Sequence, residues 1–579
     1  MFQVPAETPL RHRSGRNHAR LRAVAAVCGT PSCARNPAYL IKAKNGAVAS
    51  ENEICSNIGV DVLKKGGNAV DAAISVTLCI GVVNMFSSGI GGGGFMTVRL
   101  PPNSTSDSSE VWTIDFRERA PLAAHENMYV ADPNTARWGG LAVGVPGELR
   151  GLEKAHQLWG SMDWKELVMP AAELAKGWIV QKELERRLLM DLFTQVVLNH
   201  PDWKPIFAPH GCILREGDLI QRTALAKTLT TIAEEGPDAF YKGPIADSIL
   251  AKINATGGVM TQHDLDQYEV KVDRALQGKY RGRTIYTTHA PTSGPVLLHM
   301  FNLLEMYEDF VEEGRTPLNV HRVVEIMKFG FAARTRLSDP AFMGTKEVKT
   351  IHQIPTKSYA EFIFPNITDD STHTPQYYQP VYDVPTDHGT SHTSILDKNG
   401  MAVSITSTVN LLFGSLVLDP VTGVILNDEM DDFSIPGVTN AFGLLPSPYN
   451  YPQPGKRPLS STVPTIIEDA HGDFFAATGA SGGSRIFPAV FQALMNLDWG
   501  LDASSAVEFG RLHDQLFPTY VDADNVYPEE MLTGLRERGH NVTLSDIGRV
   551  AAVVQLVTKR GDTIYAASDS RKRGKAAGY

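Results

Sequence analysis

The chain of 579 residues lacks three features that would place it in other protein classes. Its five cysteines form no C-x-x-C motif, which argues against a zinc site. No apolar run reaches the ~18 residues that span a bilayer. Positive charge is not in excess, and a formal net charge of −10 argues against nucleic acid as the main partner. We expect an ordinary globular fold, since 43% of the residues are apolar and 20% charged. We expect no metal site in it.

The first 38 residues differ from the rest of the chain. Residues 11–22 carry five arginines and no acidic residue. The apolar run that follows, Ala23–Cys28, is shorter than the roughly 7–15 residues of a signal-peptide core. We interpret residues 1–38 as a leader, either disordered or targeting. Secretion is also indicated by four N-glycosylation triplets, each weak alone, at Asn103, Asn254, Asn366 and Asn541. We therefore expect the secretory pathway, with an extracellular, cell-surface or vacuolar destination.

Two successive helices are predicted near the start of the folded region. Glu51–Lys65 has helical spacing, and Asn68 is placed to cap a second helix, Ala69–Val83. Cys55 and Cys79 lie one on each helix and either pair or remain two buried thiols. Further predicted elements are strands at Ala47–Ala49, Phe95–Leu100 and Val111–Phe116, mostly helix over residues 141–277, and a long helix at His321–Arg336.

The amino-acid composition of the chain changes between Ile351 and Gly389. Five prolines and a polar run predict an exposed, flexible segment there. A β-rich block follows at once, because Thr390–Leu396 and Met401–Thr408 alternate as strands around an Asn-Gly turn. The chain closes with a strand at Thr563–Ala567 and a basic tail, Arg571-Lys572-Arg573.

Thr390 opens the β-rich block directly after a glycine. A threonine hydroxyl needs a base before it becomes a good nucleophile. If the chain were cut ahead of Thr390, the new α-amine, with a reference pKa of about 7.7–8.0, could act as that base. Gly389 has no side chain to block approach to the scissile carbonyl. Alone, this pattern favours an ordinary threonine at the start of a strand, because isolated motifs are weak.

Several further motifs accompany Thr390, and each occurs once along the chain. They are Gly389–Ser394, Ser404–Asn410, Phe413–Ser415, Asn427–Ser434, Pro454–Ser461, Gly479–Gly483 and Ala567–Lys572, with Gly89–Gly94 and Phe116–Pro121 in the first part. Together, from about Tyr39 to Tyr579, these blocks resemble the γ-glutamyltranspeptidases.

The resemblance implies a fold and a maturation path. The fold is that of the N-terminal-nucleophile hydrolases, an α+β architecture of four layers in the order αββα. The precursor would cut itself at Gly389-Thr390. The products would be a large subunit of residues 39–389 and a small subunit of residues 390–579, held as a heterodimer. The spacing of Cys55 and Cys79 resembles a large-subunit disulfide of animal members of the family.

The resemblance also implies an activity: γ-glutamyl transfer and glutathione hydrolysis through a γ-glutamyl ester on Thr390, with no cofactor. Water, amino acids or dipeptides would accept the γ-glutamyl group. A γ-glutamyl substrate presents an α-carboxylate and an α-ammonium, which call for a cationic fork and for carboxylates. The roles carried over are the carboxylate site at Arg117, Ser460 and Ser461, the ammonium site at Asn410, Glu429 and Asp432, the oxyanion donors at Gly482 and Gly483, and Thr408 as the group that orients Thr390.

Three other hypotheses compete. Gly479-Ala480-Ser481-Gly482-Gly483 fits the elbow of an α/β-hydrolase, with Ser481 as nucleophile, Asp514 or Asp522 as acid and His540 as base. A cephalosporin acylase of the same fold would lack the charged pocket. A processed but inactive binding protein would have lost Thr390, Thr408 or Gly482, and none is replaced. The glycines at 89–94 fit a dinucleotide fingerprint only formally, because they follow a helix and precede a strand.

Overall fold

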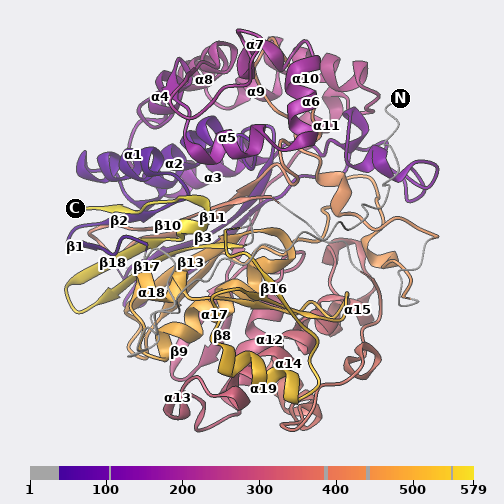
Figure 1. The fold of residues 1–579 in the computed structure, drawn as a ribbon. Coiled ribbons are helices and arrows are strands. Elements are labelled where there is room, and N and C mark those ends of the chain that lie inside the picture. The colour runs from indigo at the N-terminus through magenta and orange to yellow at the C-terminus, as the bar shows by residue number, and fades with distance from the viewer. Residues whose placement is uncertain (1–37, 103–105, 384–388, 438–443, 549–551) are drawn as a thin grey trace, which may run out of the picture. The chain divides into compact units, whose positions relative to one another are not determined.

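The structure, a computed structural model, describes residues 38–102, 106–383, 389–437, 444–548 and 552–579. The predicted leader up to residue 37 and the glycosylation triplet at Asn103 lie outside the described residues. Two seven-stranded sheets lie face to face, and helices cover the outer face of each (Figure 1). The predicted αββα layering is confirmed.

Each sheet draws strands from both sides of Gly389-Thr390. The first sheet runs in the order β19 (Ala577–Gly578), β2 (Ala47–Ala49), β10 (Ser391–Leu396), β11 (Ala402–Thr408), β3 (Gly93–Leu100), β4 (Glu110–Phe116) and β7 (Lys271–Arg274). The second runs β1 (Ile41–Ala43), β18 (Thr563–Ser568), β17 (Val553–Arg560), β13 (Phe474–Ser481), β12 (Thr465–Glu468), β9 (Arg283–Thr287) and β8 (Leu276–Tyr280). The two predicted subunits are therefore interleaved within both sheets.

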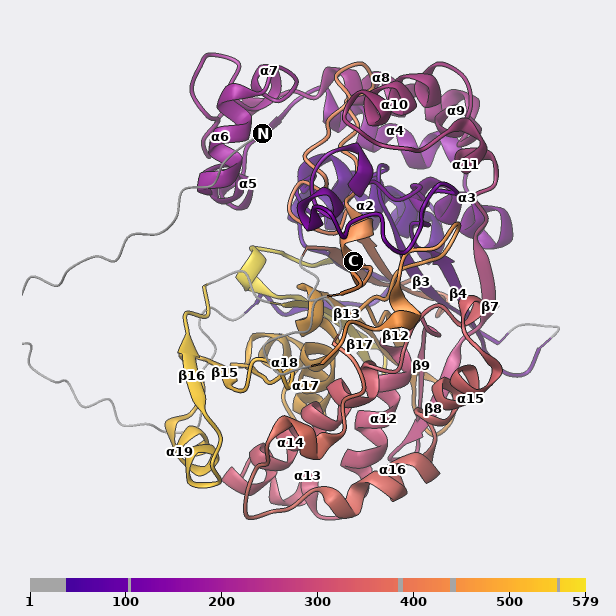
Figure 2. The same cartoon turned by 90° about the vertical axis from the view of Figure 1, so that its right-hand side faces the viewer.

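Helices from the first part of the chain cover the first sheet (Figure 1). They include α1 (Glu53–Lys64), α2 (Ala69–Val83), α3 (Glu148–Trp159), α4 (Trp164–Ala175) and α8 (Thr223–Glu235), with α5 (Lys182–Leu188), α6 (Asp191–Asn199), α7 (Lys204–Phe207), α9 (Asp238–Tyr241), α10 (Pro244–Ala255) and α11 (Gln262–Asp266) beyond them. The second sheet is covered by α12 (Gly294–Glu305), α17 (Ile486–Asp498) and α18 (Ala503–Glu508). Beyond them lie α13 (Phe310–Glu313), α14 (Pro317–Arg334), α15 (Thr345–Gln353), α16 (Lys357–Ile363) and α19 (Glu529–Glu537), as Figure 2 also shows. Short pairings join β5 (Trp178–Ile179) to β6 (Leu219–Ile220), and β14 (Leu512–His513), β15 (Val521–Asp524) and β16 (Val542–Ser545) to one another.

The predicted helix pair α1 and α2 owes its boundaries to two asparagine caps. The side chain of Asn52 accepts a hydrogen bond from the Ile54 N–H, and Asn68 forms a capping box with Asp71. Every residue of α2 is buried, because the helix lies between the first sheet and α4. The helix thus anchors β10 and β11, the strands on either side of the predicted turn.

Cys55 on α1 and Cys79 on α2 form a disulfide, with their Cα atoms 5.5 Å apart. The alternative of two buried free thiols is therefore wrong, whereas Cys212 is free and exposed. Among the helices of the described residues, none has both the length and the apolarity of a bilayer-crossing segment.

Most described residues between Ile351 and Gly389 are exposed or partly exposed, as predicted, but the segment also contains helical structure. Residues 351–383 contain the end of α15, all of α16 and two 3₁₀ turns. Tyr378 is buried, and its hydroxyl donates a 2.7 Å hydrogen bond to Glu325 on α14. The prolines break regular structure here, but the tyrosines between them still pack on α14. Residues 384–388 lie outside the described part.

We expect that replacing both Cys55 and Cys79 by alanine lowers the free energy of unfolding by about 3 kcal/mol, because the bridge closes a loop in the unfolded chain. Urea unfolding followed by fluorescence measures the change. Cys212→Ala is the matched control and should leave the midpoint in place. A double variant as stable as the parent would contradict the expectation.

Candidate functional site

Thr390 lies in strained backbone immediately before β10. Its φ is 99°, a conformation that a β-branched residue adopts only when its surroundings impose it. Gly389 has a φ of 118°, and a Cβ there would stand 1.6 Å from the carbonyl oxygen of Asn410. Only glycine therefore fits ahead of the threonine.

Two groups converge on the peptide between Gly389 and Thr390. The Gly482 N–H donates a 3.2 Å hydrogen bond to the Gly389 carbonyl, and the Thr390 and Thr408 hydroxyl oxygens are 3.2 Å apart. The Asn410 N–H donates to the Thr408 hydroxyl at 2.8 Å, which fixes that oxygen. The uncut chain thus already has a donor on the scissile carbonyl and a hydroxyl beside it.

Gly482 and Gly483 lie at the turn between β13 and α17, with φ of 126° and 61°. A Cβ at Gly482 would stand 2.5 Å from the Cα of Ala552. Glycine therefore lets the backbone here pass close to its neighbour while its N–H faces the Gly389 carbonyl.

The predicted charged residues come together as one buried group. Arg117 follows the end of β4, and Glu429 and Asp432 lie on one 3₁₀ turn. The Arg117 guanidinium forms ion pairs with Glu429 and, at 2.5 Å, with Asp432, and it donates to the Leu459 carbonyl at 2.9 Å. Segments more than 300 residues apart in the sequence thus meet at one guanidinium.

Carboxyl groups outnumber cations around Arg117, because Glu118 is a third carboxyl beside it. Burial, only partly opposed by Arg117, raises the pKa of Glu118 to about 8 and that of Glu429 well above its ordinary value. Burial alone would lower the pKa of Arg117, but the surrounding carboxylates raise it instead. The site therefore favours the arrival of one further cation.

The remaining predicted residues border this group. Asn410 donates from its side-chain amide to the Asp428 carbonyl at 3.1 Å and has a φ of 69°. Ser460 and Ser461 are both fully buried. The Ser460 hydroxyl is 3.0 Å from that of Thr462, and Ser461 accepts a hydrogen bond from Arg334. Sequence reasoning did not single out Arg334.

A second buried group beneath Thr390 was also missed. The Lys572 ammonium donates to the Thr390 carbonyl at 2.8 Å and pairs with Glu51 at 2.5 Å. The other Glu51 oxygen accepts from Ser481, and Ser391 donates to Glu51 at 2.9 Å. From the sequence, Lys572 was only part of a basic tail and of a family motif, with no predicted role, whereas Arg571 and Lys572 are buried. Only the position of Lys572 within a family motif hinted at this place.

The α/β-hydrolase hypothesis fails on these contacts. The Ser481 hydroxyl donates to Glu51 and lies 3.5 Å from Lys572. Both ring nitrogens of His540 are engaged elsewhere, with His321 at 2.8 Å and Lys328 at 3.5 Å. Asp514 lies 3.6 Å from the same lysine, and Asp522 is paired with Arg485 at 2.6 Å. The His540 base and the acids that the hypothesis requires are therefore held by other partners, and the Ser481 hydroxyl donates to Glu51 instead.

His321, Glu325 and His540 offer ligand atoms within 4.8 Å of one another, the grouping of the described residues that could hold a metal ion. However, His321 Nδ1 and His540 Nε2 share a hydrogen bond, and His321 Nε2 lies 2.7 Å from the Thr368 carbonyl. The Lys328 ammonium also lies 3.5 Å from Glu325. Protein partners thus already use the groups that a metal would need.

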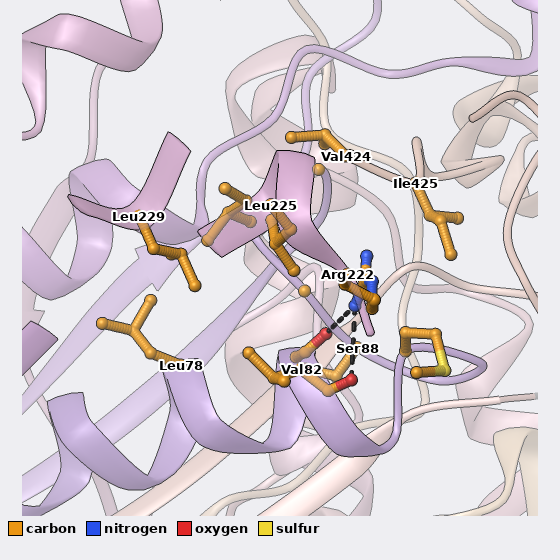
Figure 3. Close-up of a pocket in the computed structure, with 13 residues that line it drawn as sticks. Leu78, Val82, Ser88, Arg222, Leu225, Leu229, Val424 and Ile425 are labelled. Atoms are coloured by element: carbon orange, nitrogen blue, oxygen red, sulfur yellow. Dashed lines mark hydrogen bonds between the residues drawn. The ribbon is translucent and has the colours of Figure 1, made fainter. Parts of the chain in front are cut away.

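A small cavity of about 10 Å³ lies behind the glycine loop at residues 89–91 (Figure 3). Arg222 borders it and donates to the Gly81 and Val82 carbonyls at the end of α2, at 2.9 and 3.3 Å. A cation suits this helix end, although burial lowers the pKa of Arg222 to about 9. The cavity has room for about one water molecule and contains none of the predicted substrate-binding residues.

The three described glycosylation triplets are accessible to different degrees. Asn254 and Asn541 are exposed, and Asn366 is half-buried. Each amide also donates to a backbone carbonyl: Leu250 for Asn254, Ile363 for Asn366 and Thr519 for Asn541. Their modification stays a prediction.

A family model described as Gamma-glutamyltranspeptidase matches residues 55–579. Glutathione hydrolase proenzyme 2 of Schizosaccharomyces pombe is 44% identical over 544 residues, which cover 93% of this chain and 88% of that protein. The glutathione hydrolase proenzyme of Escherichia coli is 34% identical over 92% of this chain and 91% of that protein.

Two solved structures are also similar. A cephalosporin acylase from Bacillus halodurans aligns with a TM-score of 0.81 over 96% of this chain and 99% of that one. At 23% identity, this likeness bears on the fold alone. A gamma-glutamyltranspeptidase from Pseudomonas nitroreducens aligns with a TM-score of 0.52 at 31% identity, over 58% of this chain and 98% of that one.

We expect Lys572→Met to lower the free energy of unfolding by about 3–5 kcal/mol, because it leaves Glu51 buried without its cation. The double variant Lys572→Met/Glu51→Gln should recover part of the loss. Lys575→Met breaks an exposed pair with Glu53 and should cost less than about 1 kcal/mol. Urea midpoints compare the three, and equal losses for both single variants would contradict the role of the buried pair.

Proposed function

The chain belongs to the γ-glutamyltranspeptidase family, and from that premise we propose that Thr390 is the nucleophile with which it cuts itself and its substrates. It is an enzyme that cleaves γ-glutamyl amides such as glutathione and passes the γ-glutamyl group to water, amino acids or dipeptides. The observation that carries the assignment is the Gly482 N–H on the carbonyl of Gly389, directly ahead of strained Thr390.

Self-cleavage begins when the Thr390 hydroxyl oxygen attacks the Gly389 carbonyl carbon. Its proton passes to a nearby base, and the Gly482 N–H stabilises the negative charge that develops on the carbonyl oxygen. The base returns the proton to the Thr390 nitrogen as the C–N bond breaks, so that Gly389 is held as an ester on Thr390. Water hydrolyses the ester and leaves a Gly389 carboxylate and a Thr390 amine. Relief of the strained φ at Thr390 favours this direction.

Substrate turnover repeats the chemistry with the freed amine as base. The amine takes the Thr390 hydroxyl proton as the oxygen attacks the γ-carbonyl, and Gly482 and Gly483 supply the oxyanion donors. The C–N bond breaks and the leaving amine takes the proton. Water or an amino acid then attacks the γ-glutamyl ester and regenerates Thr390. Thr408, at 3.2 Å, orients the hydroxyl in both steps.

Substrate recognition follows from the charges of the buried group. Arg117, Ser460 and Ser461 would take the α-carboxylate. Asn410, Glu429 and Asp432 would take the α-ammonium, which supplies the cation that this carboxyl-rich site favours. Binding of both charged groups selects a γ-linked glutamate, whose α end is free.

Maturation would give a large subunit ending at Gly389 and a small subunit beginning at Thr390. Both sheets take strands from both subunits, which supports a heterodimer that stays together after the cut. The disulfide and the asparagine triplets support the secretory pathway as the location.

Thr390→Ala should abolish both chain cleavage and γ-glutamyl hydrolysis, because it removes the attacking oxygen. Thr390→Ser keeps a hydroxyl and should still cut, which makes it the matched control. Denaturing gels and N-terminal sequencing measure the cut, and sequencing of the parent also locates the other N-terminus and so tests the leader. Two subunits from the alanine variant would refute the assignment.

Arg117→Lys should raise KM for γ-glutamyl amides by roughly 10- to 100-fold, because a point charge replaces a planar fork. The rate of self-cleavage should change much less, since that step involves no α-carboxylate. Steady-state kinetics on the fully cut variant measure KM. An unchanged KM would remove Arg117 from carboxylate binding.

A further inference from the structure

Arg334, the last residue of α14, contacts the Ser460–Ser461 pair through its guanidinium. Its side chain is only 2% exposed. One guanidinium nitrogen, Nη2, donates to the Ser461 hydroxyl at 2.8 Å, and Nε donates to the Ser293 hydroxyl at 3.2 Å. Ser293 in turn donates to the Ser460 carbonyl at 3.0 Å. A single buried cation thus contacts Ser461 directly and Ser460 through one intermediate.

The direction of these hydrogen bonds is fixed by chemistry. A guanidinium has five N–H donors and no acceptor, so the Ser461 oxygen must accept the bond from Arg334. The single Ser461 proton must then point away from Arg334. A hydroxyl that accepts from a cation is also a stronger donor, because the hydrogen bonds of a chain polarise one another.

The second arm fixes the backbone that carries the serines. The Ser293 N–H donates to the Thr462 carbonyl at 3.3 Å, and the Ser460 N–H donates to the Pro291 carbonyl at 2.8 Å. The residues just before α12 are therefore joined to the segment that carries the serines on both sides of Ser461. Arg334 adds its charge to this junction through Ser293.

Arg117 and Arg334 both bring a guanidinium to the residues expected to bind the α-carboxylate. Arg117 pairs with Glu429 and Asp432, so carboxylates of the protein answer much of its charge. Arg334 donates to two hydroxyls: the Ser461 proton points away from the guanidinium, and the Ser293 proton is donated to the Ser460 carbonyl.

We infer that Arg334 is a positioning residue that makes the Ser460–Ser461 pair selective for a substrate carboxylate. It orients and polarises the Ser461 hydroxyl, and through Ser293 it fixes the backbone of Ser460, without touching the substrate. This inference rests on the proposed function, because the proposal assigns the α-carboxylate to these serines.

The test compares two competitive inhibitors of γ-glutamyl anilide hydrolysis. L-Glutamate carries the α-carboxylate, and 4-aminobutanoate is the same molecule without it. The ratio of their inhibition constants reports the carboxylate site alone, and a general loss of structure does not change that ratio. The ratio is measured in the parent, Arg334→Met, Arg334→Lys and Ser293→Ala, all fully cut.

Arg334→Met should reduce the preference for L-glutamate by roughly 10- to 100-fold, the effect of one hydrogen bond to a charged group. The lysine of Arg334→Lys can reach only one of Ser461 and Ser293, so the preference for L-glutamate should fall by an intermediate amount. Ser293→Ala removes one arm and should cost about 3- to 10-fold. Arg336→Met removes a neighbouring charge whose guanidinium donates to the Gln379 carbonyl, and it should leave the ratio unchanged.

An Arg334→Met enzyme that cuts itself and keeps the parental ratio would overturn the inference, as would equal weakening of both inhibitors. If that variant does not fold, Ser293→Ala decides in the same way, and an unchanged ratio there refutes the second arm and the inference with it. Failure of the proposed function looks different, because the parent itself would then show no preference for L-glutamate.

Discussion

The hydrogen bond from Gly482 to the Gly389 carbonyl joins the two sheets at the point where chemistry is proposed. Gly482 follows β13 of one sheet, and Thr390 precedes β10 of the other. The donor for a developing oxyanion therefore depends on how the sheets pack face to face. The inter-sheet contacts around His392, such as the bond from Ser404 to the Thr478 carbonyl at 2.9 Å, fix that packing.

The two buried charged groups described above differ in their ratio of carboxyls to cations. Beneath Thr390, Lys572 and Glu51 match one another and hold the backbone in place. Around Arg117 the carboxyls outnumber the cation, so the group is complete only when a further positive charge arrives. The balanced group serves structure, and the unbalanced one is suited to a ligand with its own charges.

The sequence predicted features that depend on local chemistry. The Asn68 cap, the all-buried helix α2 and the hairpin of β10 and β11 follow from capping and periodicity, and the structure has them. The meeting of Arg117 with Glu429 was expected only through family resemblance, because their spacing in the chain carries no sign of contact. No role was predicted for Lys572, because a basic run looks alike in solvent and in a core, and burial is decided by tertiary packing.

The interleaving of strands has a consequence for the life of the mature enzyme. Strand β10 begins one residue after the proposed cut, yet it lies between β2 and β11, one from each piece. While the chain is whole, folding is an intramolecular search. Once it is severed, an unfolded molecule could recover only if two separate polypeptides met again, which makes recovery depend on concentration. The cut that activates the enzyme would therefore also remove its ability to refold as a single chain.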